Sequence, residues 1–301
     1  MFAGIPSTAS CPPLSPADPR PRGFDIEVPL RGTVVEARVD TYSDRLRCDH
    51  PEVTDGERLG EALKLTAEAA DRGRIVVLAR TAVAEGLERA EFAREALIPG
   101  FYAGGEDCAV LGYALDEQRA DPGFAAEVAR VDALIHEGAR RPSRPHMPVE
   151  TARAEPEDAG GIAELIAETF AQYPTPSGVP DYIEDAIHDG VPFRVVREDD
   201  EIIACASADL VRDARTAELT DCATRPGCRG RGLMQAILGD LMGDLRDMGY
   251  PTAFTLARAR IPGVNLAFQR LGFDYRGRMT RSCRIGGGLE DMNVWSRWLA
   301  A

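Results

Sequence analysis

A glycine-rich turn between a strand and a helix constrains this sequence more than any other feature. Residues 217–224, Ala-Glu-Leu-Thr-Asp-Cys-Ala-Thr, are typical of a strand, and residues 233–248 carry apolar side chains at helical spacing. Between them lies Arg229-Gly230-Arg231-Gly232. A helix that begins directly after such a turn points unpaired backbone N–H groups and the positive end of its dipole at one spot, where a phosphate can bind. The two glycines let a ligand approach the backbone closely.

Other uses of such a turn have to be weighed. An isolated Arg-Gly-x-Gly also occurs in ordinary β-turns that lead into helices. The sequence has no Gly-x-Gly-x-x-Gly of the dinucleotide-binding type and no Gly-Lys-Ser/Thr of the nucleoside triphosphatase type. It therefore favours neither a nicotinamide-dependent enzyme nor a kinase of those classes. The flanking strand and helix favour a different phosphate-bearing ligand.

The charge balance limits the class of partner. The 301 residues include 35 Lys and Arg against 49 Asp and Glu, a formal net charge of −14. Nucleic acids and anionic membranes bind basic surfaces through counterion release, which an acidic surface does not provide. We therefore expect a soluble protein with a cationic or neutral small substrate, and neither nucleic acid nor membrane as a partner.

The cysteines and the first residues indicate where the protein works. There are seven cysteines, an odd number, with no Cys-x-x-Cys pair and no histidine at ligand spacing. This pattern predicts free thiols, a cytoplasmic location and no metal site. Residues 1–23 are rich in proline and lack an apolar stretch that could serve as a signal peptide, so we expect a disordered tail there.

The rest of the chain is predicted to form two α/β domains. Residues 24–137 alternate strand-like and helix-like segments, including a buried strand over 74–79 and a helix over 86–96. Residues 138–148 contain three prolines and three arginines, which sustain neither helix nor central strand, so we place a linker there. Residues 149–301 form the second domain. The expected fold class is α/β with a mixed sheet, and a similar order of elements leaves open that the first domain is a degenerate copy of the second.

At the glycine turn the sequence resembles the GCN5-related N-acetyltransferase (GNAT) superfamily. The Arg/Gln-x-x-Gly-x-Gly/Ala signature of that superfamily corresponds to Arg229, Gly232 and Met234, and Met234 departs from the small residue expected. Leu271-Gly272-Phe273 resembles the superfamily's exit into its last hairpin. A tyrosine that often serves as general acid on the CoA sulfur is replaced here by Phe268.

Several segments resemble one family within that superfamily, the β-lysine N-acetyltransferases. They are 173–176, 217–224, 256–259 and 290–295 in the second half, and 42–45 and 95–102 in the first. The resemblance implies direct transfer of the acetyl group of acetyl-CoA, without a metal, to the N6 amine of β-lysine. The product is the osmolyte Nε-acetyl-β-lysine. A homodimer is left open.

The resemblance also implies which residues contact the cofactor. They lie at the end of the strand, in the turn, at the start of the helix and on a later helix: Cys222, Ala223, Thr224, Arg229, Gly230, Arg231, Gly232, Leu233, Met234, Asn265 and Phe268.

Two carboxylates on the strand before the turn are the candidate catalytic residues. Amine acetylation needs the ammonium group deprotonated, and a nearby carboxylate can accept that proton or hold the ammonium. Glu218 and Asp221 are three residues apart, so in a regular strand they point to opposite faces, and only a bulge would bring both to the substrate. Surface acids on a strand edge are the alternative.

Further residues are candidate substrate contacts. Tyr173 could wall the aliphatic chain, and Arg258 or Arg260 could bind a carboxylate. Glu290 could bind an ammonium, and Asn293 could hydrogen-bond either charged group. Structural roles in the core or on the surface are the alternatives for each.

Two classes of function follow. The first is an acetyltransferase acting on β-lysine, with a polyamine or lysine as other acceptors. The second is a CoA-binding sensor or interaction module without turnover, which Phe268 and Met234 favour and which Glu218 and Asp221 oppose.

Overall fold

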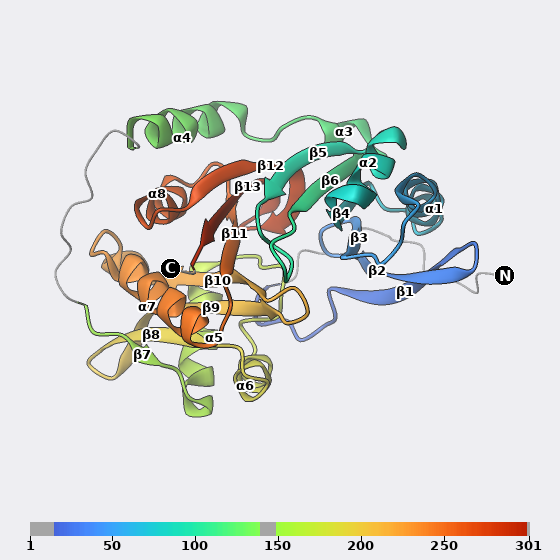
Figure 1. The fold of residues 1–301 in the computed structure, drawn as a ribbon. Helices are drawn as coiled ribbons and strands as arrows, with labels where there is room; N and C mark the ends of the chain where they lie inside the picture. Colours follow the sequence, from blue (N-terminus) through green and yellow to red (C-terminus); the bar gives the residue numbers. More distant parts are fainter. Residues whose placement is uncertain (1–14, 139–148, 300–301) are drawn as a thin grey trace.

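Thirteen strands form one continuous mixed sheet in the computed structural model, which describes residues 15–138 and 149–299 (Figure 1). Their order is β1-β2-β3-β4-β6-β5-β12-β13-β11-β10-β9-β8-β7. The first half contributes β1 (Gly23–Leu30), β2 (Thr33–Asp40), β3 (Arg45–Asp49), β4 (Arg74–Arg80), β5 (Ala93–Ile98) and β6 (Cys108–Ala114). The second contributes β7 (Ala152–Arg153), β8 (Phe193–Glu198), β9 (Glu201–Val211), β10 (Thr216–Thr224), β11 (Thr252–Arg258), β12 (Asp274–Ile285) and β13 (Gly288–Trp298). The expected α/β class with a mixed sheet is confirmed.

Helices cover the sheet and connect its strands. The first half contains α1 (Gly56–Ala69), α2 (Thr81–Arg89), α3 (Glu117–Ala120) and α4 (Ala125–Gly138). The second contains α5 (Ala159–Thr169), α6 (Pro180–His188), α7 (Leu233–Asp247) and α8 (Pro262–Arg270), with short 3₁₀ turns η1 (Pro156–Asp158) and η2 (Pro226–Cys228).

The two halves connect their strands in the same way. In the first half the order along the chain is β2, β3, α1, β4, α2, β5, β6, and in the second it is β9, β10, α7, β11, α8, β12, β13. In each half one parallel pair, β3 with β4 or β10 with β11, spans the first helix crossover. The sheet order is mirrored about the β5–β12 contact. This correspondence supports the hypothesis that the first half is a degenerate copy.

Three apolar cores lie against the sheet. Along β4, alternate side chains enter different cores, because successive strand residues point to opposite faces. Ile75 and Val77 pack with α1 and α2 in the outer core of the first half, while Val76 and Leu78 enter a core shared by both halves. A third core lies between α7 and the strands of the second half. The face of the sheet toward the shared core is called the inner face below.

Side chains of the first half form hydrogen bonds with backbone groups of β12 that β13 leaves unpaired. The register of β12 with β13 shifts between Met279 and Cys283. There Glu95 accepts from the Thr280 N–H at 3.0 Å, the Arg119 guanidinium donates to the Arg281 carbonyl at 3.0 Å, and the Arg45 guanidinium donates to the Ser282 carbonyl at 2.6 Å. Buried backbone groups need such partners, so these side chains join the halves.

Helix α4 lies on the second half although the sequence assigned it to the first domain. Gln269 on α8 donates its Nε2 hydrogen bond to the Ile135 carbonyl at 2.7 Å, and Arg278 on β12 pairs with Asp132. Figure 1 shows α4 beside α8. The predicted boundary at 137/138 therefore separates α4 from the second half, although α4 packs against that half. The predicted linker residues 139–148 lie outside the described residues.

Two other sequence-based predictions differ from the structure. The helix expected over 86–96 is α2, which ends at Arg89, and β5 occupies 93–98, because pairing with β6 outweighs the helix propensity of those residues. Residues 1–14 of the predicted tail lie outside the described residues. Residues 15–22 are ordered, since the Arg22 guanidinium donates to the Ser15 carbonyl at 2.9 Å and the Gly178 N–H donates to Pro16.

Gly277 provides a test of the junction between the halves. It pairs with Ala96 across β12 and β5, has φ +145°, and a Cβ there would lie 2.0 Å from the Glu95 carbonyl oxygen. Gly277→Val should therefore destabilise the protein by about 1–3 kcal/mol, measured as a lower midpoint in urea unfolding. Gly160→Ala is the control, because Gly160 on α5 has open space around it. Equal midpoints for both variants would contradict this account of the junction.

Candidate active site

The glycine turn leads directly from β10 into α7, as the sequence predicts. Gly230 and Gly232 have φ of +80° and +82°, conformations that favour glycine, and Gly232 is the N-cap of α7. No side chain caps the helix. Among the described residues, the backbone N–H groups of 230–235 donate to no protein acceptor. Six amides and a helix dipole thus remain available to an anion.

The side chains around the turn leave room for that anion. Arg229 is exposed and its Nε donates to the Thr224 carbonyl at 3.3 Å, while Arg231 forms an exposed ion pair with Glu198. Met234 packs against the core beneath α7, so the residue that departs from the superfamily signature points into the protein. Its size therefore does not block the amides.

Strands β10 and β11 are parallel neighbours that separate. They pair in register only over 216–218 and 252–254, yet β10 continues to Thr224 and β11 to Arg258. Beyond Glu218, β10 keeps its hydrogen bonds to β9 and exposes its other edge. An exposed strand edge can accept an extended, amide-bearing ligand as an additional strand.

A β-bulge brings both candidate carboxylates to the inner face. The register of β10 with β9 shifts between Thr220 and Ala223, and Asp221 has φ +48°. Ala217 and Leu219 lie in the core under α7, so Glu218 points to the inner face. Ser207 binds Asp221 and lies two residues along β9 from Asp209, which is the register partner of Glu218, so the two carboxylates lie near each other. Of the two geometries considered from the sequence, the bulged one is present.

Hydroxyl groups surround Asp221. Ser207 on β9 donates to its Oδ2 at 2.8 Å, and the hydroxyls of Ser177 and Tyr173 also hydrogen-bond to this carboxylate. Tyr173 is buried and its hydroxyl also reaches Thr220, so it adjoins the predicted site. Asp221 is thus held in one position by β9 and by the loop that carries Tyr173 and Ser177.

A third carboxylate and a second tyrosine, both missed from the sequence, complete an acidic cluster of Asp209, Glu218 and Asp221. Asp209 follows Ser207 at strand spacing on β9 and interacts with the other two carboxylates, and Tyr182 on α6 lies near Asp209 and Asp221. The Ser-x-Asp spacing in 207–209 is the signal that could have revealed the third acid.

Desolvation by the surrounding protein raises the pKa of each carboxyl group in the cluster, although Asp209 keeps an exposed side, Glu218 is partly exposed and only Asp221 is buried. It raises the pKa of Glu218 to about 7, against the lowering effect of Arg47, and raises the pKa of Asp209 to about 8 with help from the charge of Asp221. The Asp221 pKa is also raised by burial, while the Ser207 hydroxyl lowers it. A cluster with these pKa values can bind a cation and accept a proton near neutral pH.

Several predicted site residues instead form a buried network along the first part of β13. Glu290 is 1% exposed and pairs with Arg258 at 2.7 Å and Arg260 at 2.6 Å. Asn265 donates to the Arg258 and Ile261 carbonyls and accepts from Asn293 and Trp295, which uses its amide fully.

This burial bears on five predicted contacts. Asn265, Asn293 and Phe268 have no exposed surface in this conformation, and Arg258 and Glu290 pair with each other. Their predicted ligand contacts stay predictions. Ala223 is also fully buried, whereas Cys222 and Thr224 are partly exposed beside the turn.

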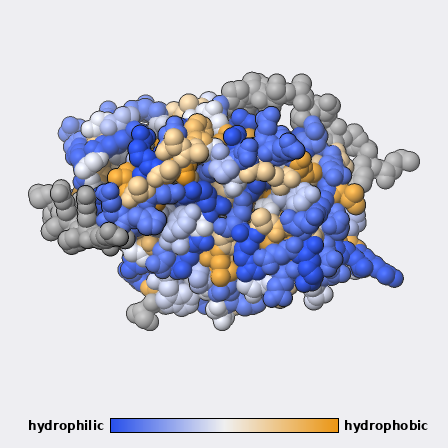
Figure 2. All heavy atoms as spheres, turned by 90° about the horizontal axis from the view of Figure 1, so that it is seen from above, coloured by the Kyte–Doolittle hydropathy of each residue, from blue (hydrophilic) through white to orange (hydrophobic). Residues whose placement is uncertain are grey.

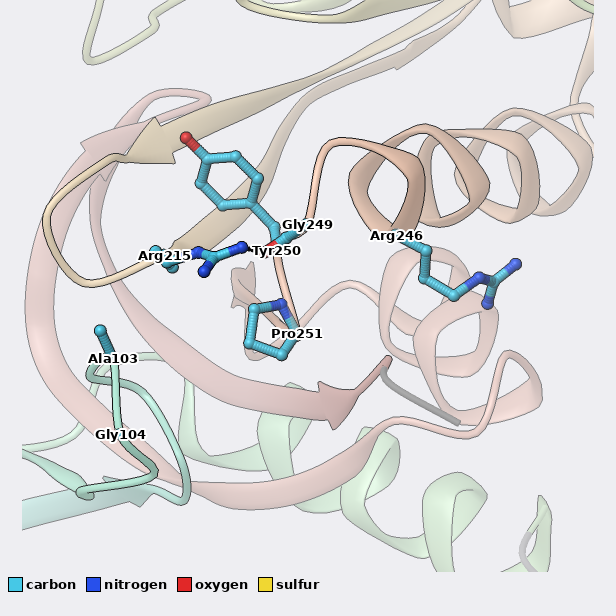
Figure 3. Close-up of a pocket in the computed structure, with 7 residues that line it drawn as sticks. All are labelled: Ala103, Gly104, Arg215, Arg246, Gly249, Tyr250 and Pro251. Carbon is cyan, nitrogen blue, oxygen red and sulfur yellow. Dashed lines mark hydrogen bonds between the residues drawn. The ribbon is translucent and has the colours of Figure 1, made fainter.

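A hollow of about 450 Å³ lies elsewhere, at the amino ends of β10 and β11 (Figure 3). It is lined by Ala103, Gly104, Arg215, Arg246, Gly249, Tyr250 and Pro251. Arg215 is engaged with the Gly249 carbonyl at 2.6 Å, and the lining contains no carboxylate. Because the glycine turn follows the carboxyl end of β10, this hollow is at the opposite end of the strand from the turn.

Metal sites, cysteines and membrane-spanning helices are three further features that the sequence analysis considered. In the ranges 15–138 and 149–299 no group of three or more His, Cys, Asp or Glu is arranged to hold a metal ion. The six cysteines in those ranges are free thiols. Within the same ranges, every helix falls short of the length and apolarity that crossing a membrane requires. On the face seen in Figure 2, hydrophilic residues surround small groups of apolar ones.

Known proteins resemble this chain in the region just described. The pattern of the Acetyltransferase (GNAT) family matches residues 161–273. The N-acetyltransferase YodP of Bacillus subtilis is 31% identical over 227 residues, which are 75% of this chain and 82% of that protein. The chain belongs to the GNAT acetyltransferase family. The predicted membership of the GNAT superfamily is confirmed, and that family uses acetyl-CoA as its cosubstrate.

Two other relatives align over a shorter length. The beta-lysine N(6)-acetyltransferase of Methanosarcina mazei is 40% identical over 142 residues, 47% of this chain and 52% of that protein. That of Methanococcus maripaludis is 28% identical over 138 residues, 46% of this chain and 50% of that protein. The matched part of this chain thus spans about half the length of these two relatives. A phosphinothricin acetyltransferase structure from Sinorhizobium meliloti in complex with AcCoA is 21% identical, with a TM-score of 0.45, over 51% of this chain and 90% of that one.

The glycine turn of this GNAT protein yields a test of cofactor placement. Gly232→Trp should raise the Kd for acetyl-CoA at least about 100-fold, because an indole there would fill the space before the six free amides. Isothermal calorimetry measures the change, and a thermal melt checks that the variant is folded. Gly160→Trp, on an exposed position of α5, should bind as the unaltered protein does. Unchanged affinity in Gly232→Trp would move the cofactor away from this turn.

Proposed function

We propose that this protein transfers the acetyl group of acetyl-CoA directly to the N6 amine of β-lysine, giving Nε-acetyl-β-lysine. The observation that carries the proposal is the acidic cluster at the point where β10 and β11 separate, on the strand that leads to the free amides of the glycine turn. An acyl donor bound by those amides and a cationic acceptor bound by the cluster would meet there. The names of the two aligned beta-lysine acetyltransferases support the choice of acceptor.

The separated strand edge supports a path for the cofactor. With the diphosphate at the amides of 230–235, the pantetheine arm would run back along β10 from Thr224 toward Glu218. Six residues of strand span roughly 20 Å. The thioester would then lie near the bulge at Asp221, where the acidic cluster begins.

Glu218 is the residue best suited to accept the proton of the amine. It is partly exposed, whereas Asp221 is buried and engaged by hydroxyl groups, and its pKa of about 7 suits a general base at neutral pH. We assign Asp221 and Asp209 to holding the ammonium groups of the acceptor. The sequence alone ranked Glu218 and Asp221 equally.

The transfer itself forms one bond and breaks one. The neutral N6 nitrogen attacks the thioester carbonyl carbon, and the C–S bond then breaks to release the CoA thiolate. Phe268 is fully buried and has no proton to donate. A thiol has an ordinary pKa of about 8.5, so the thiolate can leave unassisted and then take up the proton that the new amide nitrogen gives up, directly or through water.

A CoA-binding module without turnover is the second candidate. The absence of a hydroxyl at Phe268 favours it. The raised pKa of Glu218 beside a free strand edge favours an enzyme, because a binding module has no need of a base. The role of the product as an osmolyte, the cytoplasmic location and a homodimer stay predictions.

An acetyl-transfer assay separates these two candidates. Purified protein with acetyl-CoA should release free thiol in the presence of β-lysine, and mass analysis should show the product acetylated on N6. The same assay with α-lysine, ornithine and spermidine ranks the acceptors. Failure of every amine to release thiol, with acetyl-CoA binding intact, would leave only the binding module.

The pH dependence tests the base. Glu218 must be deprotonated to accept a proton, so kcat/KM for β-lysine should rise with pH and level off above an apparent pKa between about 7 and 8, which belongs to the coupled cluster. Glu218→Gln should lower kcat about 10²–10⁴-fold and remove this dependence. Glu164→Gln, on the exposed face of α5, is the control. A pH profile unaltered by Glu218→Gln would assign the base to another group.

A further inference from the structure

Three arginines of the first half face the acidic cluster of the second. On β3, Leu46 and Cys48 enter the outer core of the first half, so Arg45 and Arg47 project from the inner face. On β2, Ala37 and Val39 enter the same outer core, so Arg38 also projects inward. Arg45 is committed to the junction through Asp40 and Ser282.

Arg38 and Arg47 form an unusual cross-strand pair. They are directly opposite each other in the register of β2 and β3. Like charges in that position repel and reduce stability, so their presence on one face calls for an explanation. Each has one carboxylate partner at 2.8 Å, Asp25 for Arg38 and Asp49 for Arg47.

Arg47 still has hydrogen-bonding capacity. Its Nη2 atom binds Asp49, while its Nε is buried and, among the described residues, has no hydrogen-bond partner. The side chain is 29% exposed. A buried donor without a partner is costly, and a guanidinium edge of this kind suits a carboxylate that accepts two parallel hydrogen bonds.

Both arginines are within electrostatic reach of the acidic cluster. Glu218 acts on Arg47 and Arg47 acts on Glu218, while Arg38 acts on Tyr182, which borders Asp209 and Asp221. The basic pair of β2 and β3 and the acidic cluster of β9 and β10 therefore oppose each other across the two halves. A molecule between them would be bound best if it were positive at one end and negative at the other.

We infer that Arg47, with Arg38 beside it, binds the carboxylate of the acceptor, so that the first half selects an amino acid over a plain diamine. This inference rests on the proposed function and adds the part of the site that recognises the substrate. The acceptor's ammonium groups would face Asp209, Glu218 and Asp221 while its carboxylate faced Arg47. A polyamine would place a positive group against the arginines and would be disfavoured.

In the described part of the first half, the helix start that corresponds to the glycine turn is not open to a second cofactor. The helix that corresponds to α7 is α1, and its N-terminus is occupied by Asp55, whose carboxylate accepts from the Arg58 N–H at 3.0 Å. A carboxylate in that position takes one of the free amides and repels a phosphate. The inner face of β2 and β3 is therefore the part of this half that the active site can use.

The experiment compares two acceptors that differ by the carboxylate alone. 1,4-Diaminopentane is β-lysine with a hydrogen in place of the carboxylate. Because Arg47 also lowers the pKa of Glu218, both acceptors are assayed on the high-pH plateau, where Glu218 is deprotonated in either protein. There Arg47→Gln should raise KM for β-lysine about 10–100-fold with kcat changed less than about threefold, and should leave kcat/KM for 1,4-diaminopentane unchanged. In Arg47→Lys, KM for β-lysine should lie between that of the unaltered protein and that of Arg47→Gln, because an ammonium keeps the charge and loses the paired hydrogen bonds. Arg89→Gln, an exposed arginine on α2, is the control and should alter neither acceptor.

Each outcome decides the inference. An equal loss for both acceptors in Arg47→Gln would mean that Arg47 supports the fold, and an unaltered protein that uses both acceptors equally well would remove the carboxylate site while leaving acetyl transfer intact. Should no acceptor release thiol, the proposed function fails. Calorimetry of β-lysine and 1,4-diaminopentane with the CoA-bound protein then decides whether Arg47 binds the carboxylate, since only β-lysine binding should weaken in Arg47→Gln.

Discussion

The early separation of β10 and β11 is the constraint on which the rest of the site depends. A parallel pair that stayed together would cover the edge of β10 and leave no place for an extended ligand. Here pairing stops after Glu218, and the bulge at Asp221 turns the strand so that two carboxylates share one face. The Thr255 hydroxyl donates to the Leu219 carbonyl at 2.7 Å, which satisfies the first backbone group beyond the paired region. This hydrogen bond thus stabilises the separated strands. The turn at Gly230 and Gly232 comes after the free part of β10.

The first half completes the site because the sheet is continuous. Side chains of β5 and β3 replace missing partners of β12, and this fixes the inner face of β3 opposite β10. Carboxylates and arginines on facing surfaces lower the cost of burying either set, since each provides the other with opposite charge. Burial still dominates at Glu218, whose pKa is raised to about 7 despite Arg47. That balance leaves a carboxyl group that can change its protonation at neutral pH.

Features contained in one stretch of sequence could be predicted, and features made by distant stretches could not. The turn and the start of α7 at Leu233 follow from glycines and helical spacing within one segment. The pairing of Arg38 with Arg47, or the approach of Asp209 to Glu218, depends on strand order, which local patterns do not encode. The misassigned helix over 86–96 shows the same limit, because the strand β5 is defined by its neighbours. Glu290 and Arg258 are separate candidate substrate contacts in the sequence, and whether they bind a ligand or each other depends on burial.

The mirrored order of strands has a consequence for how such a chain could have arisen and how it can be divided. If two copies of one unit were once equal, the one that kept open helix amides retained the donor site, and the other was free to cap its helix with Asp55. The copies then became mutually dependent, since residues 149–301 expressed alone would expose the edge of β12, the shared apolar core and the surface of α8 that α4 covers. Such an edge invites pairing with other chains and aggregation. A protein cut at the linker is therefore expected to be insoluble, and the two halves together form the folding unit.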